Sequence, residues 1–460
     1  MQPMPTSPQD QLRALPLQIK RRDPALRMQQ DAPLAGFAQA ARKHQKDIME
    51  TWRGYDLAPY LDEPLATPCR QADSPSAQVA CNIPLLQATR IAVVNGHCYE
   101  PLRRLPSGVL LGSLREAMRQ YPDLVGRHMG TAILRPNPYQ GLNGQHFTDG
   151  VFVLVPDGVS LEEPIQLLDI ADSPEATLTQ TRNLVVVGRG AQVTLFHCDD
   201  SATPRRSVAN NVTELLLGQD SQAQYYKMQN MNNASALLNQ CFVTMQQGAR
   251  LLSHAITLNG GHVRNHAEVR MQGARCHAEA HGLYLIDGSQ RADNYIYVEH
   301  NAPECVSHEL YKGIADDSAR ALFGGHVLAR EHAAKTEAYM SNKNILLTDK
   351  ASVSTHPFLE IYHDDVKCSH GATTGQVNDE EMFYIRSRGI SERTARTLLL
   401  YAFCDEVVQK MAHPTLREAV ADMVKKRLHG ELTPCGECAI PCSSPCNGPN
   451  VDFHIDKERL

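Results

Sequence analysis

The chain has no apolar stretch that approaches the length of a membrane span, and residues 1–30 lack the apolar core of a secretory leader. Its basic residues are dispersed and its formal net charge is −6, so a nucleic-acid surface is not indicated. The phosphate-binding pattern Gly-x-x-x-x-Gly-Lys-Ser/Thr is also missing. We therefore expect a cytoplasmic protein that binds neither membrane nor nucleic acid and that has no phosphate-loop ATPase site of its own.

A compact disulfide framework is missing as well. The 13 cysteines are an odd number and most of them lie singly, which in a reducing compartment predicts free thiols or metal ligands. The exception is the C-terminal tail, which places four thiols close together at Cys435, Cys438, Cys442 and Cys446. Their spacing is compatible with a wrapped zinc or iron–sulfur site, and equally with a flexible tail that carries thiols.

The first part of the chain, residues 1–140, is mixed and turn-rich with helical signals. One of these is the capping box Ser113-x-x-Glu116, which begins a helix expected to end near Tyr121. We expect this region to form an N-terminal helical cap. A chain of 460 residues with 42% hydrophobic content can also bury a large core.

Residues 141–388 have a different pattern. Short β-rich runs with alternating apolar residues, such as 193–196 and 295–298, are separated by small turn pairs such as Gly190-Ala191. Irregularly spaced strand–turn units without long helices predict stacked repeats. A mainly β fold with a right-handed parallel β-helix, or solenoid, as its core fits best, and a β-sandwich is the alternative.

Residues 389–432 predict a C-terminal helical unit. Ser391 is a good N-cap, Pro414 suits the start of a second helix, and Gly430 suits its C-terminal cap. The apolar stripes are Ala395, Leu398, Leu399, Ala402, Phe403 and Val407, then Leu416, Ala419, Val420, Met423, Val424 and Leu428. Two helices cannot bury both stripes by themselves, so the unit must pack on the solenoid or on a partner. Residues 433–460 form the cysteine-rich tail.

A thiol and an imidazole lie two positions apart at Cys368 and His370. If this segment is a strand, both side chains point to the same face. That arrangement is half of a metal or iron–sulfur site, which usually takes about four protein ligands. The missing ligands would come from elsewhere in the chain or from another chain. The alternative is a buried cysteine packed beside a hydrogen-bonded histidine.

Twelve of the 20 histidines lie between His254 and His370. Pairs such as His262/His266 and Cys276/His277 fit no clean metal motif. We expect most of these side chains to be structural or solvated.

The run Cys368-Ser369-His370-Gly371-Ala372-Thr373, between Asp364-Asp365 and the run 384–390, resembles the family of SufD and its paralogue SufB. These are the non-ATPase subunits of the bacterial SUF iron–sulfur cluster assembly scaffold. Further similar pieces, covering roughly residues 90–412, are Leu142-Asn143, Asp149-Gly150, Pro164-Ile165, His300-x-x-Pro303, Ser307, Phe323-Gly324-Gly325, Leu346-Leu347 and Pro357-x-Leu359-Glu360-Ile361. The Cys-Ser-His-Gly block favours the SufD branch, and the N-terminal cysteine motif expected of SufB is absent.

The resemblance implies a β-helix and a scaffold rather than an enzyme. It implies a SufB homologue and the SufC ATPase as partners, with a transient iron–sulfur cluster built at the interface shared with SufB. His370 would supply a ligand there with Cys368 close by, and residues 389–432 would dock SufC. Whether the complex binds a flavin is left open, and the resemblance assigns the tail no role. Exposed apolar surface on the last solenoid strands would also favour a weak homodimer of the chain alone.

Two other functions are alternatives. A purely architectural partner of SufB would keep the fold without supplying a ligand. A β-solenoid enzyme acting on polysaccharide would need clustered carboxylates, and the adjacent Asp364 and Asp365 would face opposite ways on a strand. The same defect applies to Asp316 and Asp317.

Overall fold

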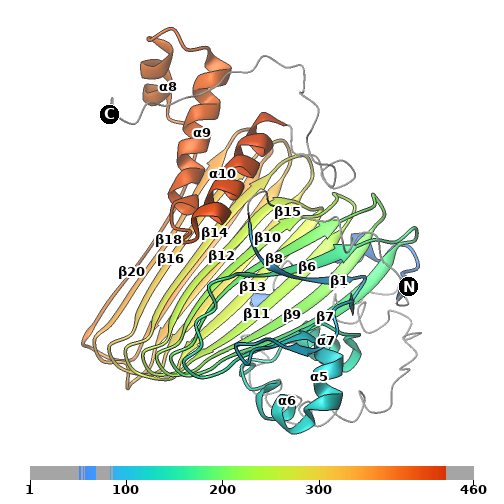
Figure 1. Cartoon of the computed structure of the whole chain (residues 1–460). Helices are drawn as coiled ribbons and strands as arrows, with labels where there is room; N and C mark the ends of the chain where they lie inside the picture. The colour runs from blue at the N-terminus through green and yellow to red at the C-terminus, as the bar shows by residue number, and fades with distance from the viewer. Residues whose placement is uncertain (1–50, 53–54, 56, 69–82, 84–85, 431–460) are drawn as a thin grey trace, which may run out of the picture.

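The computed structural model describes residues 51–52, 55, 57–68, 83 and 86–430. Two long, stacked ladders of strands run through the molecule, with helices at both ends of the chain (Figure 1). Sheet I has the order β2-β1-β6-β8-β10-β12-β14-β16-β18-β20, and sheet II has the order β19-β17-β15-β13-β11-β9-β7-β5-β4-β3. From β5 onward, successive strands therefore alternate between the two sheets, which is the pattern of a β-solenoid and confirms the predicted fold class.

The strands of sheet I are β1 (Thr89–Val94), β2 (His97–Cys98), β6 (Ile165–Ala171), β8 (Gln192–Ser201), β10 (Gln222–Asn230), β12 (Arg250–Asn259), β14 (His277–Ile286), β16 (Val306–Ala315), β18 (Thr336–Leu346) and β20 (Val366–Gly375). Those of sheet II are β3 (Arg103–Arg104), β4 (Leu110–Ser113), β5 (Val151–Val155), β7 (Thr177–Val187), β9 (Ser207–Leu217), β11 (Ala236–Met245), β13 (His262–Met271), β15 (Arg291–His300), β17 (Arg320–Ala329) and β19 (Ser352–Ile361). The helical elements are η1 (Ala58–Tyr60), α5 (Leu114–Gln120), α6 (Pro122–His128), α7 (Pro138–His146), α8 (Asp379–Arg386), α9 (Glu392–Val408) and α10 (Pro414–His429).

Alternation along each strand separates two cores. In β8, Val193 and Leu195 face the interior between the two sheets, where they join residues of both sheets. Phe196 and Cys198 of the same strand face outward and pack beneath α9 and α10. Because neighbouring strands pair in parallel and in register, each inward position stacks on an inward position of the next turn.

The N-terminal region combines helices with the first strands. Ser113 caps α5 by accepting a hydrogen bond from the Glu116 N–H, as the capping box predicts. Residues 1–140, however, also contain β1 and β4. These two strands pair with strands beyond residue 140: β1 in parallel with β6, and β4 antiparallel with β5. The two sheets therefore begin before residue 141.

The C-terminal helices begin and end as their caps predict. The Ser391 side chain accepts from the Thr394 N–H, and Gly430 takes the left-handed conformation, with φ of 75°. The inward face of α9 differs from the expected stripe, because Leu400 and Cys404 are buried and Ala402 is exposed. Apolar residues occupy much of this helix, so contact with sheet I decides which of them are covered.

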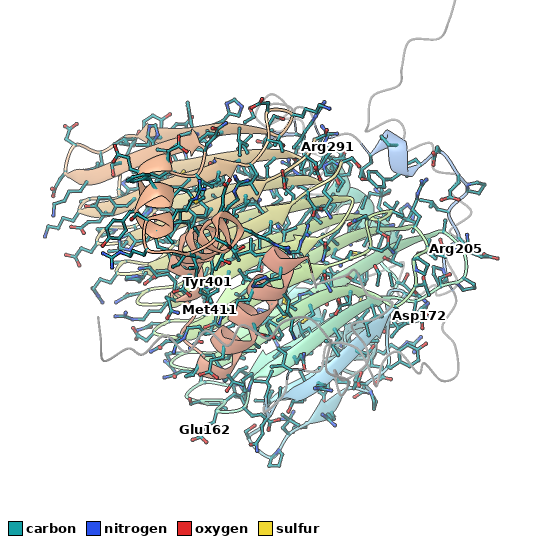
Figure 2. The ribbon with its side chains drawn as sticks, turned by 90° about the horizontal axis from the view of Figure 1, so that it is seen from above. Glu162, Asp172, Arg205, Arg291, Tyr401 and Met411 are labelled. Atoms are coloured by element: carbon teal, nitrogen blue, oxygen red, sulfur yellow. The ribbon has the colours of Figure 1, made fainter. Side chains whose placement is uncertain are left out.

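Figure 2 shows α9 and α10 lying across the strands of sheet I, with Tyr401 and Met411 labelled. The additional helix α8 falls inside the range 141–388 that was expected to be β-helix, because the strand ladder ends at Gly375. Among the described residues, none of the helices has the length and apolar character needed to cross a membrane.

Candidate functional site

The solenoid has an open end at β19 and β20. In the part of the chain that the structure describes, no strand pairs with the outer edge of either one. Most of their residues are exposed or half-buried, whereas the strands of the preceding turns are largely buried. An uncovered strand edge offers unpaired backbone N–H and C=O groups to another chain.

Register places Cys368 and His370 on the inward face at this end. Cys368 pairs with Ala338 and His370 pairs with Met340, and both of these partners are buried in the core between the sheets. The expectation that the thiol and the imidazole share one face therefore holds. Cys368 is half-buried against the core, whereas His370 is exposed because no further turn covers it.

The inward positions across the open end come from β19. Thr355, Pro357 and Leu359 pair with inward residues of β17, and Leu359 packs against the core. Pro357 has no N–H to donate to a ladder, which suits an edge strand. The open end is therefore rimmed by a thiol and an imidazole on one sheet and by mainly apolar groups on the other.

Beneath His370 lies a buried carboxyl group. Glu309 pairs with Met340, which pairs in turn with His370, so the three residues form one inward column. Burial raises the pKa of Glu309 to about 8. Burial also raises the pKa of the Cys368 thiol, with a smaller contribution from Glu309. The thiol must therefore lose a proton before it could bind a metal.

Cys368 and His370 do not acquire further ligands from the described residues. The one group of three or more His, Cys, Asp or Glu side chains that converges closely enough for a metal there is Asp169, His197 and Asp199. That the thiol and the imidazole are half of a metal site stays a prediction, and its further ligands would have to come from outside the described residues.

Large apolar side chains are exposed near the same end. Phe358 is 53% exposed on β19, and Ile361 at the end of that strand and Tyr362 just after it are also exposed. On α8, Phe383 is 76% exposed and Tyr384 is also exposed. Exposed patches of large apolar side chains are typical of protein-interaction surfaces.

A groove lies between the end of β18 and the helices α8 and α9. Its volume is about 590 Å³, and its lining includes Leu347, Met382, Phe383 and Arg396. Both apolar and charged groups therefore face it, and its apolar wall is continuous with the exposed face of α8.

Other residues considered from the sequence lie in structural pairs. His262 is 2.9 Å from Asp293 and His266 is 2.9 Å from Glu268, while Cys276 donates to the Gly273 carbonyl. Asp364 and Asp365 lie in the bend between β19 and β20. Cys435, Cys438, Cys442 and Cys446 lie outside the described residues.

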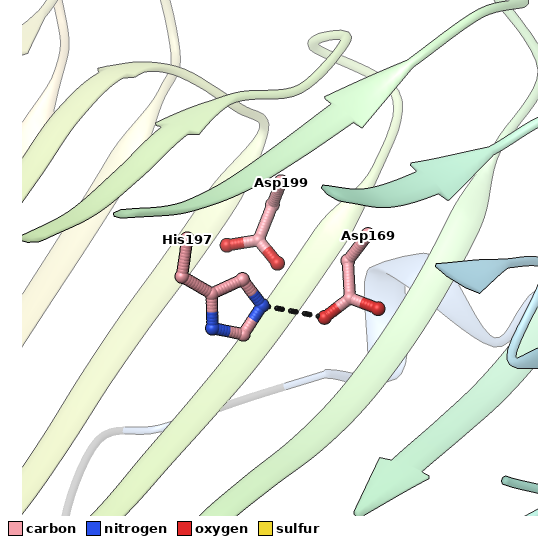
Figure 3. Close-up of side chains that lie close together, drawn as sticks. All are labelled: Asp169, His197 and Asp199. Atoms are coloured by element: carbon pink, nitrogen blue, oxygen red, sulfur yellow. Dashed lines mark hydrogen bonds and ion pairs between the residues drawn. The ribbon is translucent and has the colours of Figure 1, made fainter. Parts of the chain in front are cut away.

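Sequence reasoning missed the convergent group Asp169, His197 and Asp199, which Figure 3 shows on neighbouring strands. A signal was present, because His197 and Asp199 continue the inward alternation of Val193 and Leu195. The contribution of Asp169, 28 residues before His197, could not be read from spacing.

Comparison with known proteins identifies the family. Residues 170–403 match the SUF system FeS cluster assembly, SufBD core domain, and residues 20–167 match the SufBD protein N-terminal region. The chain belongs to the SufBD family. Membership in this family supports a role in iron–sulfur cluster assembly, and the SufD-like members are scaffold components of that system.

Relatives in the SufBD family align with between 39% and 84% of the chain. An iron–sulfur cluster assembly SufBD family protein of Synechocystis sp. is 28% identical over 396 residues, or 84% of this chain and 87% of the relative. Iron–sulfur cluster assembly protein SufD of Escherichia coli is 30% identical over 281 residues, or 60% of this chain and 66% of the relative. A SufBD family protein of Mycobacterium tuberculosis is 38% identical over 187 residues, or 39% of this chain and 47% of the relative.

Proposed function

We propose that this chain is a SufD-like scaffold subunit that joins a SufB-type subunit and a SufC-type ATPase in the cytoplasm. A nascent iron–sulfur cluster, the cargo of the assembly, would form at the interface with the SufB-type subunit. His370 would supply one ligand, and Cys368 would lie beside the cluster or bind it. The observation that carries this proposal is the inward placement of both side chains at the uncovered end of the solenoid.

The open end suits a partner with a similar end. The free edges of β19 and β20 can be extended by strands of a second solenoid, because main-chain hydrogen bonds do not depend on the partner's sequence. Exposed Phe358 and Ile361 would lose apolar surface to water on such contact. A paralogue with the same fold would have a solenoid end of the required kind, which favours a SufB-type partner over an unrelated one.

The ligand chemistry supports a shared cargo site. A neutral imidazole and a thiolate are both iron ligands, and two such groups leave about two coordination positions for another chain. The raised pKa of Cys368 means that iron or a partner's positive charge must stabilise its thiolate. Among the two, exposed His370 is therefore the better candidate for a direct ligand.

The predicted docking region for the ATPase is the C-terminal helical unit of residues 389–432, and α8 lies directly before it. The apolar faces of α9 and α10 are already covered by sheet I, so they leave little apolar surface for a partner. The groove at Leu347, Met382 and Phe383 is open instead. We assign the SufC-type contact to this groove and to the exposed face of α8.

The decisive experiment co-expresses the chain with SufB-type and SufC-type homologues and compares the wild type with His370→Ala. Complex stability by light scattering and iron–sulfur absorbance are measured on the same sample. His370→Ala should leave the complex intact and lower cluster yield at least about tenfold, because a lost ligand has no substitute. His370→Cys should restore part of the yield.

A matched control is His356→Ala, which removes an exposed histidine on the outward side of β19. It should leave cluster yield unchanged. Full cluster assembly by His370→Ala would make this chain an architectural partner. A monomer that binds neither homologue would reject the scaffold proposal itself.

A further inference from the structure

A second cluster of ligand-type side chains lies inside the first turns of the solenoid. Asp169 is on β6, and His197 and Asp199 are on β8. Their inward direction follows from alternation, since Ile165, Leu167, Val193 and Leu195 on the same faces belong to the core between the sheets. Asp169 and Asp199 are directly paired in register, so their carboxylates lie side by side.

The distances suit a single small ion. His197 Nε2 lies 2.8 Å from Asp169 Oδ2, and one ligand atom from each of the three residues lies within 4.8 Å of the others. Asn211 reaches the same point from sheet II, where its Nδ2 donates to both carboxylates at 3.3 Å. Four polar side chains from three strands therefore meet at one place.

Two acceptor atoms in this cluster have no partner among the described residues. They are Asp169 Oδ1 and Asn211 Oδ1, and both are fully covered from solvent. Asp169 as a whole is only 9% exposed and Asn211 is only 2% exposed. Leaving a buried acceptor without a donor is unfavourable, and a cation bound beside the paired carboxylates would satisfy both atoms.

The charges point the same way. Lys227 Nζ lies 2.9 Å from Asp199 Oδ1 and 2.8 Å from its Oδ2, which balances one of the two carboxylates. Asp169 contacts the His197 imidazole and the Asn211 amide instead. A cavity of about 20 Å³ adjoins Asp169, Asp199 and Asn211, which is room for about one water-sized occupant.

We propose that Asp169, His197 and Asp199 bind one divalent transition-metal ion inside the solenoid. A half-turn of the Asn211 side-chain amide would present its Oδ1 as a fourth ligand and remove the second unpartnered acceptor. Two carboxylates and an imidazole, without sulfur, suit Mn²⁺, Fe²⁺ or Zn²⁺. Six strand spacings in sheet I separate β8 from β20, or roughly 29 Å, so this site is distinct from Cys368 and His370.

The test uses the full chain and Mn²⁺, because Mn²⁺ prefers carboxylate and imidazole ligands and binds thiolates weakly. Binding is followed by electron paramagnetic resonance. The wild type should bind about one Mn²⁺ per chain, and pulsed measurements should detect a coupled imidazole nitrogen. Asp169→Asn, which preserves side-chain shape, should weaken binding at least about tenfold, and His197→Gln should also abolish the nitrogen coupling.

The matched control is His262→Gln, which disrupts another buried histidine–carboxylate pair, His262 with Asp293. It should leave Mn²⁺ binding unchanged, as should the double variant Cys368→Ala/His370→Ala. Absence of tight Mn²⁺ binding would overturn the proposal, and so would wild-type binding without nitrogen coupling. The nitrogen coupling is measured on the wild type, so this test remains valid even if a substitution prevents folding.

Discussion

Several buried polar side chains in this solenoid pair with the corresponding positions of neighbouring turns. Asn211, Asn239, Asn265 and Asn294 stack in one inward column of sheet II. Asn239 donates to Asn265, and Asn265 donates to Asn294, each at 3.2 Å. Such ladders supply hydrogen bonds where water is excluded and fix the register of each turn against the next.

Glu309 is the buried carboxyl whose environment gives a pH prediction. Burial raises its pKa in the folded chain to about 8, well above the value of about 4.3 in an unfolded chain. Between these values the folded state binds the extra proton, so its contribution to the free energy of unfolding falls as pH rises from about 4.3 through 8.

We predict that Glu309→Gln removes this pH dependence. The difference in free energy of unfolding, variant minus wild type, should increase by up to about a few kcal/mol from pH 5 to pH 8. Denaturant titrations of both proteins at several pH values measure the difference. Glu304→Gln, at an exposed position, should show no such trend. Parallel pH profiles of Glu309→Gln and the wild type would contradict the assignment.

At the scale of elements, the α9–α10 junction is attached to sheet I by both apolar and polar contacts. Met411 is buried in the outer core. The Tyr226 hydroxyl accepts hydrogen bonds from the N–H groups of Ala412 at 3.0 Å and His413 at 3.3 Å. Lys312 Nζ donates to the Phe403 carbonyl at 2.9 Å and also pairs with Glu406. These contacts hold the helical unit to the solenoid.

Tyr226→Phe should loosen this junction without unfolding the strands. The change leaves two backbone N–H groups without their acceptor, at a cost of about 1–3 kcal/mol. Hydrogen exchange should become faster at residues 409–413, while β10 and β12 should exchange as in the wild type. Tyr362→Phe, at an exposed tyrosine, serves as the control. Unchanged exchange at the junction would show that apolar packing alone holds the helices.

The whole molecule is asymmetric along its solenoid axis. Helices and the first strands accompany the beginning of the ladder, whereas β19 and β20 end it without a covering strand in the described residues. Uncovered edges and exposed apolar side chains favour association. The chain alone should therefore form a weak, concentration-dependent homodimer in light scattering, and a SufB-type partner should displace it.

Phe358→Asp should weaken both associations. It places a charge on the apolar rim of the open end, which is costly to desolvate in a contact. Because Phe358 is already exposed, folding stability should change by less than about 0.5 kcal/mol. Light scattering and thermal unfolding of the same sample separate the two effects. Leu134→Asp, at an exposed apolar residue elsewhere, should leave association unchanged, and equal loss in both variants would place the interface elsewhere.

Local features of the chain were determined by its sequence. The caps at Ser113, Ser391 and Gly430, the alternating strands and the shared face of Cys368 and His370 all depend on neighbours within a few residues. That this pair is half of a metal site stays a prediction. The family resemblance, which rests on whole motifs, predicted the solenoid fold without locating its individual strands.

Tertiary structure decided everything that depends on contact between turns. Contacts between turns place Cys368 and His370 inward at an open end. Contact with sheet I determines which face of α9 is buried, and the strand ladder stops before α8. Tertiary structure also brought Asp169 to His197 across 28 residues of chain. The physical reason is that strand alternation repeats every two residues and depends only on neighbouring residues, whereas the register between turns depends on packing between segments distant in the sequence.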